Sequence, residues 1–378
     1  MRVLATLTYY HPHWTGLSTF ATRIAEGLAA RGHDVTVVTT RHSPALPADE
    51  WRAGVHIVRL RPWAHVSRGA IVPTWPTTIA PIIDAHDVVR LHTPQAEAGL
   101  IAHLAARRSR PVVMTHHGDL VMPAGAFNRL VERAVTASMS TAGRLARVVV
   151  PLSADYAAAS PFLRQFASTV RPISPPVDLP APRPHDVKAW RDELGLTGHR
   201  VIGIAGRFVE EKGFDFLLRA VPALLHAEPR THFVFAGEHR VAYEAFFAHC
   251  RGLWEPHARH LTMVGLITDP QRLANFYAMC DVFALPSRTD CFAAVQVEAM
   301  LSGTPVVASD IPGAREVVTR TGMGRLCAPG DPQALADALI EVAQQRPRYL
   351  RSRDTVRAIY DPVRAIDDYE ALLREIVA

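Results

Sequence analysis

Lysine is nearly missing from this chain of 378 residues, in which Lys188 and Lys212 are the two lysines among 41 lysines and arginines. Its four cysteines form no C-x-x-C pair, so we expect reduced thiols and neither a zinc site nor a disulfide framework. No run reaches the roughly 18 uninterrupted apolar residues of a membrane span. The N-terminus has no signal-peptide pattern, so we expect a cytoplasmic protein.

Motifs that define several other classes are also missing. An aromatic RNP run and a Cys/His finger are absent, so we expect no nucleic-acid partner. No G-x-G-x-x-G follows the first strand-like segment, which disfavours a dinucleotide oxidoreductase. No D-x-D motif is present, and His11 and His13 have no third ligand at a suitable spacing. We therefore expect no metal site, no cofactor and metal-independent activity.

The composition is that of a folded protein with an uneven charge distribution. Hydrophobic residues make up 48% and charged residues 20% of the chain, and the length suggests about two or three domains. Residues 1–172 contain 18 arginines and 10 acidic residues, whereas the remainder has 23 basic and 26 acidic residues. A basic N-terminal half indicates an anionic partner, such as a phospholipid surface or a phosphorylated acceptor.

Strand-like and helix-like segments alternate along the chain, which is typical of parallel sheets with the doubly wound topology. We expect strands at 3–8, 35–40, 201–205, 233–236, 282–285 and 306–309, and helices at 17–31, 214–225 and 295–301. Six prolines lie between residues 172 and 184, where neither a helix nor a central strand can continue. The sequence therefore predicts an N-terminal domain at 1–172, a linker at 173–186 and a second domain at 187–361. Two such domains leave a cleft between them, and open sheets bind ligands beyond the carboxyl ends of their strands.

Lys212 closes a segment that resembles a buried strand, a short loop and a helix start, residues 201–213. A compact ammonium beside Arg207 at a helix N-terminus is suited to holding a diphosphate. The alternative is a solvated surface lysine.

Two carboxylates follow the strand expected at 282–285. Asp290 and Glu298 are eight residues apart, across a loop and a helix start. Glu298 has apolar neighbours, so an ionised carboxylate there needs hydrogen-bond donors, which ligand hydroxyls would supply. The alternative is a helix-surface glutamate without a role.

The pattern Gly206-Arg207-x4-Lys212-Gly213, followed by Asp290 with seven residues between it and Glu298, resembles glycosyltransferase family four. Further segments resemble this family in order, at 10–17, 28–35, 112–119, 176–178 and 362–377. The resemblance implies the GT-B fold, two Rossmann-like α/β domains facing across a cleft. It also implies that a C-terminal helix, 362–378, completes the N-terminal domain.

The resemblance also assigns roles to individual residues. The residues it places at the donor are Gly16, Gly206, Arg207, Lys212, Asp290, Phe292, Ala293, Ala294 and Glu298. Arg207 and Lys212 would hold the diphosphate, Glu298 the ribose hydroxyls, and Asp290 would lie near the donor sugar. The backbone amides of 292–294 would point at the sugar or phosphate, and Gly16 would let the first loop approach the diphosphate.

The catalytic residues implied by the resemblance are His117, Asp290, Arg207 and Lys212. His117 follows a strand and would lie near the transferred sugar, although a structural histidine is the alternative in a chain with 19 histidines. His116 is expected to be structural. Asp290, Cys291 and Ala293 replace the glutamate and two glycines usual in the family, so donor preference cannot be transferred. The sequence identifies no acceptor-binding residues.

We therefore expect a retaining, metal-independent hexosyltransferase that uses a UDP- or GDP-linked sugar and a hydroxyl acceptor, which can be lipid-linked. The setting would be the synthesis of bacterial surface polysaccharide, lipopolysaccharide or glycolipid. No carboxylate pair of the double-displacement type is evident, and the family's front-face mechanism would explain why positive charge is supplied instead. The alternatives are a nucleotide-sugar 2-epimerase of the same fold and a non-catalytic sugar-nucleotide-binding scaffold.

A basic helical face indicates a membrane contact. Arg129, Arg133, Arg144 and Arg147 fall on one face of an expected helix. Together with the apolar segment 70–83, this face would rest on an anionic bilayer, at the inner face of the membrane. The alternative is a plain solvated face.

Overall fold

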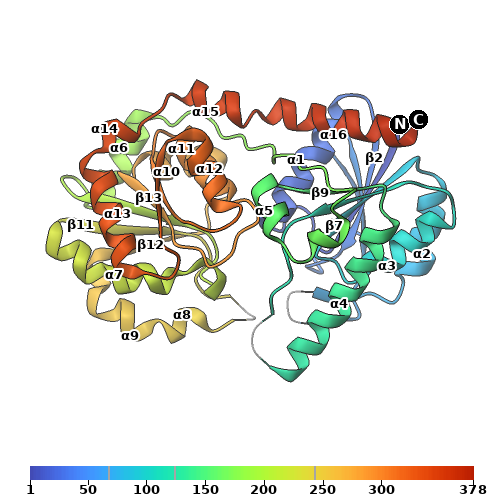
Figure 1. Cartoon of the computed structure of the whole chain (residues 1–378), viewed down its shortest axis with the longest axis horizontal. Coiled ribbons are helices and arrows are strands. Elements are labelled where there is room, and N and C mark those ends of the chain that lie inside the picture. Colours follow the sequence, from blue (N-terminus) through green and yellow to red (C-terminus); the bar gives the residue numbers. More distant parts are fainter. Residues whose placement is uncertain (67–68, 123–124, 242–243) are drawn as a thin grey trace. The chain divides into compact units, whose positions relative to one another are not determined.

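The computed structural model describes residues 1–66, 69–122, 125–241 and 244–378. The chain folds into two compact units (Figure 1). Unit 1 contains Met1–Pro176 and Pro362–Ala378, and unit 2 contains Val177–Asp361. Each unit is built on a largely or wholly parallel sheet, so the α/β, doubly wound class expected from the alternating pattern is confirmed.

Among the described residues, the main sheet of unit 1 has seven strands in the order β3-β4-β2-β1-β7-β8-β9. These are β1 (Arg2–Leu7), β2 (Asp34–Thr40), β3 (Asp49–Arg52), β4 (Val55–Leu60), β7 (Val88–Thr93), β8 (Val112–His116) and β9 (Val148–Pro151). The edge strand β3 runs antiparallel to β4, and the other pairs are parallel. A separate antiparallel pair is formed by β5 (Ala64–Val66) and β6 (Gly69–Ile71). Strand order reverses between β1 and β7, where doubly wound sheets bind ligands.

Helices of unit 1 connect these strands and pack on the sheet. They are α1 (Gly16–Ala30), α2 (Trp75–Asp84), α3 (Ala98–Ala106), α4 (Ala126–Leu145), α5 (Ala154–Ala159), the 3-10 helix η1 (Leu163–Phe166) and α16 (Pro362–Val377). Helix α1 ends at Ala30, one residue before the end expected from the sequence, and Gly32 after its C-cap adopts the left-handed conformation with φ 82°. Helix α16 packs beside α1, and its Tyr369 is fully buried.

In unit 2 the described strands form a six-stranded sheet in the order β12-β11-β10-β13-β14-β15. These are β10 (Arg200–Ala205), β11 (Thr231–Ala236), β12 (Leu261–Gly265), β13 (Val282–Leu285), β14 (Val306–Ser309) and β15 (Gly324–Cys327). Every pair is parallel, and β10, β11, β13 and β14 are almost wholly buried, which explains their continuous apolar runs. The strand order reverses between β10 and β13.

The helices of unit 2 include α7, whose apolar side packs into the core beneath β10 and β11. The helices are α6 (Pro184–Glu193), α7 (Phe214–Ala227), α8 (Phe246–His249), α9 (Arg251–Trp254), α10 (Pro270–Ala278), α11 (Ala294–Leu301), α12 (Ala314–Thr321), α13 (Pro332–Gln344), α14 (Arg346–Tyr349) and α15 (Arg353–Ile359). Two 3-10 helices, η2 (Glu210–Lys212) and η3 (Glu255–His260), complete the unit.

The proline-rich segment is irregular, without helix or strand, over residues 171–183. Helix α6 begins at Pro184, within the range expected to be a linker, because proline is favoured in the first turn of a helix. The division between the units falls at 176/177, and again at 361/362.

Two expectations about the basic face of unit 1 are wrong. Arg147 does not lie on the same helix as Arg129, because α4 ends at Leu145 and the amide of Arg147 donates to Val112 at the start of β8. The apolar segment 70–83 does not form a free surface, because Trp75, Ile79 and Ile83 of α2 are buried in unit 1. No helix in the described parts of the chain is long and apolar enough to cross a bilayer.

Candidate functional site

Unit 2 brings its predicted donor residues to the carboxyl ends of two neighbouring strands. Gly206 and Arg207 directly follow β10, and Asp290 lies in the loop after β13. These strands flank the point where the strand order reverses, so both loops leave the sheet at the place where ligands bind in this topology.

Lys212 and Asp290 form an ion pair across these two loops. The Lys212 Nζ lies 2.7 Å from Asp290 Oδ2, and the side chains are 25% and 8% exposed. Burial opposes the charged ammonium, but the carboxylates of Asp290 and Glu211 outweigh it and raise the pKa of Lys212. The ammonium therefore stays charged at neutral pH, and its partner is one of the residues predicted to contact the donor.

Arg207 supplies a second cation five residues before Lys212. Its guanidinium lies 3.8 Å from the carboxylate of Glu211, four residues further along the chain. Gly206 precedes it with φ 132°, a conformation that favours glycine, and a Cβ there would meet no atom within 4 Å. Arg207 and Lys212 thus place two positive groups in one short segment after β10.

Glu298 is buried in α11 rather than displayed on a helix surface. Glu298 is 8% exposed, and its Oε2 accepts a hydrogen bond of 2.9 Å from the Tyr277 hydroxyl of α10. The donor that a buried carboxylate requires is therefore partly provided by the protein. Tyr277 was not found from the sequence, because nothing in the spacing of α10 indicates which residue faces α11.

The loop before α11 is tightly constrained. Phe292 is buried and packs edge-to-face on Tyr360 with ring centroids 5.6 Å apart. A Cβ at Gly313 would approach the carbonyl oxygens of Asp290 and Cys291 to 2.5 and 2.6 Å, so this contact requires glycine. The amide of Ala294, expected to point at the ligand, instead donates to the carbonyl of Phe292 at 3.1 Å.

Arg288 links the loop after β13 to the segment that carries Lys212. Its guanidinium donates to both carboxylate oxygens of Asp215 at 2.7 and 2.8 Å and lies over the ring of Phe216. It also donates to the carbonyl of Glu210, 2.9 Å away, at the start of η2. Arg288 thereby fixes η2 relative to the loop that contains Asp290. It was not predicted, because one arginine among many gives no signal in the sequence.

In unit 1, Gly16 is the first residue of α1. Thr15 and Ser18 form a capping box, in which the Ser18 amide donates to Thr15 Oγ1 at 3.1 Å and the Thr15 amide donates to Ser18 Oγ at 2.9 Å. A Cβ at Gly16 would meet no atom within 4 Å, so the space beside this helix start is open.

His117 follows β8 and lies against a second histidine. Its Nε2 is 3.0 Å from the Nδ1 of His92, and both rings pack edge-to-face on Phe20 of α1. Burial, with the charges of His116 and Arg90, lowers the pKa of His117 to about 3. His117 is therefore neutral at physiological pH.

His116 has a different environment from His117. Its Nε2 is 3.0 Å from Asp119 and its Nδ1 is 3.1 Å from the Thr93 hydroxyl, while the ring stacks on Phe162. Both of its nitrogens are thus engaged by unit 1 itself.

Metal binding has no candidate site in the described part of the chain. No group of three or more His, Cys, Asp or Glu residues there is arranged to hold a metal ion. His11 and His13, considered as a pair from the sequence, do not belong to such a group.

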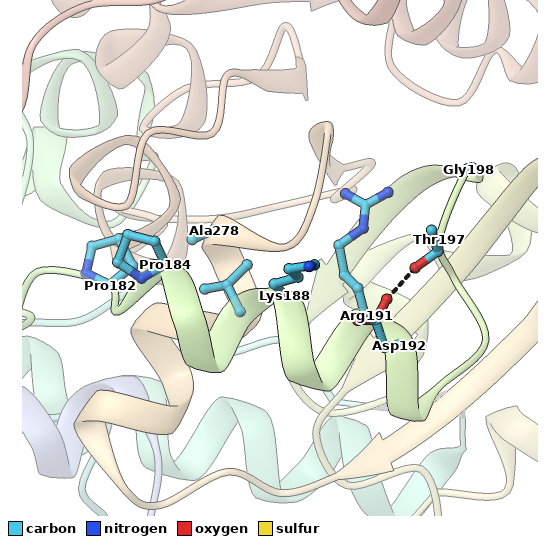
Figure 2. Close-up of a pocket in the computed structure, with 9 residues that line it drawn as sticks. Pro182, Pro184, Lys188, Arg191, Asp192, Thr197, Gly198 and Ala278 are labelled. Atoms are coloured by element: carbon cyan, nitrogen blue, oxygen red, sulfur yellow. Dashed lines mark hydrogen bonds between the residues drawn. The ribbon is translucent and has the colours of Figure 1, made fainter.

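A groove of about 500 Å³ lies elsewhere on unit 2, along α6 (Figure 2). It is lined by Pro182, Pro184, Val187, Lys188, Arg191, Asp192, Thr197, Gly198 and Ala278. Figure 2 shows the Asp192–Thr197 hydrogen bond at one end and the prolines at the other. None of the predicted donor residues lines this groove, so we assign it no part in the chemistry.

Comparisons with known proteins agree on one family for both units. Residues 14–179 match the family described as Glycosyltransferase Family 4, and residues 199–345 match Glycosyl transferases group 1. An uncharacterized glycosyltransferase of Methanocaldococcus jannaschii is 25% identical over 346 residues, covering 85% of this chain and 83% of that protein. D-inositol 3-phosphate glycosyltransferase 1 of Catenulispora acidiphila is 29% identical over 355 residues, covering 86% and 81%.

The fold is shared with solved structures at lower identity. Anabaena HepE, crystallised in complex with UDP, superposes with a TM-score of 0.79 at 21% identity, covering 99% of this chain and all of that one. This similarity shows that the two chains share their architecture.

Proposed function

Because the chain belongs to the family 4, group 1 glycosyltransferases, we propose that it transfers a hexose from a nucleoside diphosphate sugar, UDP- or GDP-linked, to a hydroxyl acceptor. The observation that carries this proposal is the group of charged residues at the ends of β10 and β13. Arg207 and Lys212 provide two positive charges within one short segment. The Glu298 carboxylate, eight residues after Asp290 in the sequence, accepts a hydrogen bond from the Tyr277 hydroxyl.

Transfer from a nucleoside diphosphate sugar requires the protein to stabilise a leaving diphosphate. A guanidinium offers two parallel donors to phosphate oxygens, and an ammonium adds a point charge where negative charge develops. We propose these roles for Arg207 and Lys212, contact with the ribose hydroxyls for Glu298, and contact with the donor sugar for Asp290. We also propose that His117 contacts the transferred sugar and that Gly16 lets α1 approach the diphosphate.

We propose transfer with retention of configuration. The bond between the anomeric carbon and the phosphate oxygen breaks, and the acceptor oxygen bonds to the same face of that carbon. The acceptor proton passes to the departing phosphate oxygen, so no strong protein base is required. We propose that this step needs no metal ion, which activity measured in EDTA would test, and the anomeric coupling constant of the product reports its configuration.

The first test is a thermal-shift titration with UDP, GDP, ADP and dTDP. A ligand that binds the folded state at 100 times its Kd stabilises it by about 2.7 kcal/mol, or several degrees in Tm. We expect one nucleotide to produce this shift, and we expect Lys212→Ala and Glu298→Ala to abolish it.

The chain offers a matched control in its other lysine. Lys188 is exposed on α6, beside the groove of Figure 2, so Lys188→Ala should keep the full nucleotide shift. Equal loss in both lysine variants would indicate a nonspecific charge effect. No shift with any of the four nucleotides would contradict the donor site.

The acceptor setting that we propose is glycolipid or surface polysaccharide synthesis at an anionic membrane. Phe127 and Leu130, in the first turns of α4, are 63% and 66% exposed, and Arg129 and Arg133 beside them are also exposed. Apolar side chains flanked by arginines suit the boundary of an anionic bilayer.

Vesicle flotation tests this contact. We expect the chain to float with phosphatidylglycerol vesicles but not with phosphatidylcholine vesicles. The double variant Phe127→Ser/Leu130→Ser should remain at the bottom of the gradient with both kinds of vesicle. Leu266→Ser is the control, because Leu266 is 57% exposed in unit 2. Absence of flotation with anionic vesicles would remove the membrane contact and leave the transfer reaction unaffected.

The two alternative functions considered from the sequence have less support than glycosyl transfer. A nucleotide-sugar 2-epimerase is not favoured, because both units match glycosyltransferases. A non-catalytic scaffold would show the nucleotide shift without turnover over a broad panel of acceptors.

A further inference from the structure

The contact between His92 and His117 raises the question of which nitrogen carries the shared proton. His92 lies in β7 and is fully buried, and its Nδ1 is 3.0 Å from the Nε2 of His117. A neutral imidazole has one donor nitrogen and one acceptor nitrogen. A proton on one ring in this contact therefore fixes the protonation of all four nitrogens.

Neither ring is charged in this environment. Burial lowers the pKa of His92 well below its ordinary value, and repulsion from the charge of Arg90 and from any proton added to His117 acts in the same direction. Arg90 from β7 and His116 from β8 act electrostatically on the pair, and Tyr369 from α16 contacts Arg90 and Phe20 beside it. None of these provides a carboxylate that would stabilise an imidazolium.

The other nitrogen of His92 decides between the two arrangements. The Nε2 of His92 is buried and has no hydrogen-bond partner among the described residues. If His117 donated to His92, that Nε2 would carry a hydrogen with no acceptor. If His92 donates, Nε2 carries a lone pair instead.

A nearby positive charge favours the lone pair. Arg90 lies two positions from His92 on the same face of β7, is fully buried, and has its guanidinium over the ring of Tyr369 at 4.8 Å. Its positive charge attracts a lone pair and repels an N–H on the neighbouring imidazole. Buried N–H groups without an acceptor are also rare in folded proteins.

We infer that His92 is a positioning residue that donates its Nδ1–H to the Nε2 of His117, so that His117 is held as the tautomer with its proton on Nδ1. His117 is then a hydrogen-bond donor through Nδ1 and has no nitrogen left to act as a base. This inference rests on the proposed function only for the role of His117 toward the sugar, whose oxygens would accept that bond. The tautomer itself is a property of unit 1 without any ligand.

The tautomer can be measured directly on the whole chain. In protein labelled with ¹⁵N-histidine, long-range ¹H–¹⁵N correlation distinguishes protonated from unprotonated ring nitrogens, and His92→Asn and His117→Asn variants assign the signals. We expect His117 to be protonated at Nδ1 and unprotonated at Nε2 from pH 5 to pH 9. A His117 signal protonated at Nε2 overturns the inference.

Matched amide substitutions test the consequence for turnover. An asparagine amide occupies the place of imidazole Nδ1, whereas a glutamine amide occupies the place of Nε2. We expect His117→Asn to retain more activity than His117→Gln, and His92→Leu to lower kcat about tenfold with KM little changed, the effect of one hydrogen bond. His92→Asn, which keeps the donor, should restore most of that loss.

Folding and nucleotide binding are controlled separately. His92→Leu removes a buried nitrogen that has no partner but also takes the donor from the Nε2 of His117, so its Tm should fall by only a few degrees, and its nucleotide thermal shift should equal that of the unmodified chain. An unchanged kcat in His92→Leu, or a greater retention in His117→Gln than in His117→Asn, overturns the positioning role. Loss of the nucleotide shift in the unmodified chain would instead count against the proposed function and leave the tautomer assignment intact.

Discussion

The ion pair between Lys212 and Asp290 gives the sharpest quantitative prediction. At 2.7 Å and an effective dielectric constant of about 20, the gross attraction is about 6 kcal/mol. Desolvation of both groups offsets most of it. Removing one partner of a buried pair costs about 3–5 kcal/mol, whereas exposed pairs contribute about 0–1 kcal/mol. Because Lys212 is 25% and Asp290 8% exposed, we expect Asp290→Asn to lower the free energy of unfolding by about 1–3 kcal/mol.

A double-mutant cycle isolates the interaction. Asp290→Asn, Lys212→Met and the double variant should give a coupling energy of about 1–2 kcal/mol in urea unfolding. The pair should also respond to pH in a defined direction. The pKa of Lys212 is raised, so the stabilisation is complete below the unfolded lysine value of about 10.4 and is lost as the pH rises through the folded value. A coupling energy below about 0.5 kcal/mol at pH 7 would refute this reasoning.

The same pair predicts an effect on the donor. In the structure the Lys212 ammonium faces a carboxylate, and a diphosphate bound as we propose would have to share or displace it. Asp290→Asn should therefore strengthen binding of the stabilising nucleotide several-fold, by removing like-charge repulsion, while lowering turnover if Asp290 orients the sugar. Weaker nucleotide binding in this variant would show that Asp290 supports the diphosphate site.

Three further substitutions test other parts of the structure. Arg288→Ala removes a bidentate carboxylate contact and should destabilise unit 2 by about 1–2 kcal/mol and weaken the nucleotide thermal shift; an unchanged shift would exclude a role in fixing η2. Gly213→Ala should cost more than about 2 kcal/mol in urea unfolding, because φ is 66° and a Cβ would overlap the carbonyl of Pro286; a loss under about 1 kcal/mol would contradict this geometry. The pKa of Glu370 is lowered to about 2 by hydrogen bonds, first from Arg374, so Glu370→Gln should cost about 1 kcal/mol above pH 5. This cost should disappear as the pH falls through about 2, and a pH-independent difference in Tm would argue against it.

Much of the fold follows from local patterns in the sequence. The strand expected at 201–205 is β10, and the strands expected at 282–285 and 306–309 match β13 and β14, because fully buried parallel strands require unbroken apolar runs. The expected helix at 295–301 begins one residue earlier in α11. These segments could be predicted because burial on both faces leaves little choice of residue.

The contacts that organise the site could not be predicted in the same way. Tyr277 meets Glu298, and Arg288 meets Asp215, only after separate elements have packed against one another. His92 could not be singled out among the 19 histidines, because the sequence does not show which ring a strand residue will contact. Sequence spacing therefore identifies which loops we propose to carry the chemistry, and tertiary packing decides which side chains surround them.

The origin of α16 has a consequence for how the chain is made. Unit 1 includes Pro362–Ala378, and the fully buried Tyr369 and Leu373 of this last helix complete its core. All of unit 2 must therefore be synthesised before unit 1 can finish folding, although most of unit 1 precedes unit 2 in the sequence. During synthesis the N-terminal part of unit 1 therefore exposes the apolar surface around Phe20 that Tyr369 later covers, while unit 2 can fold first. We expect a nascent chain halted before residue 362 to expose the apolar side chains of unit 1 that α16 covers.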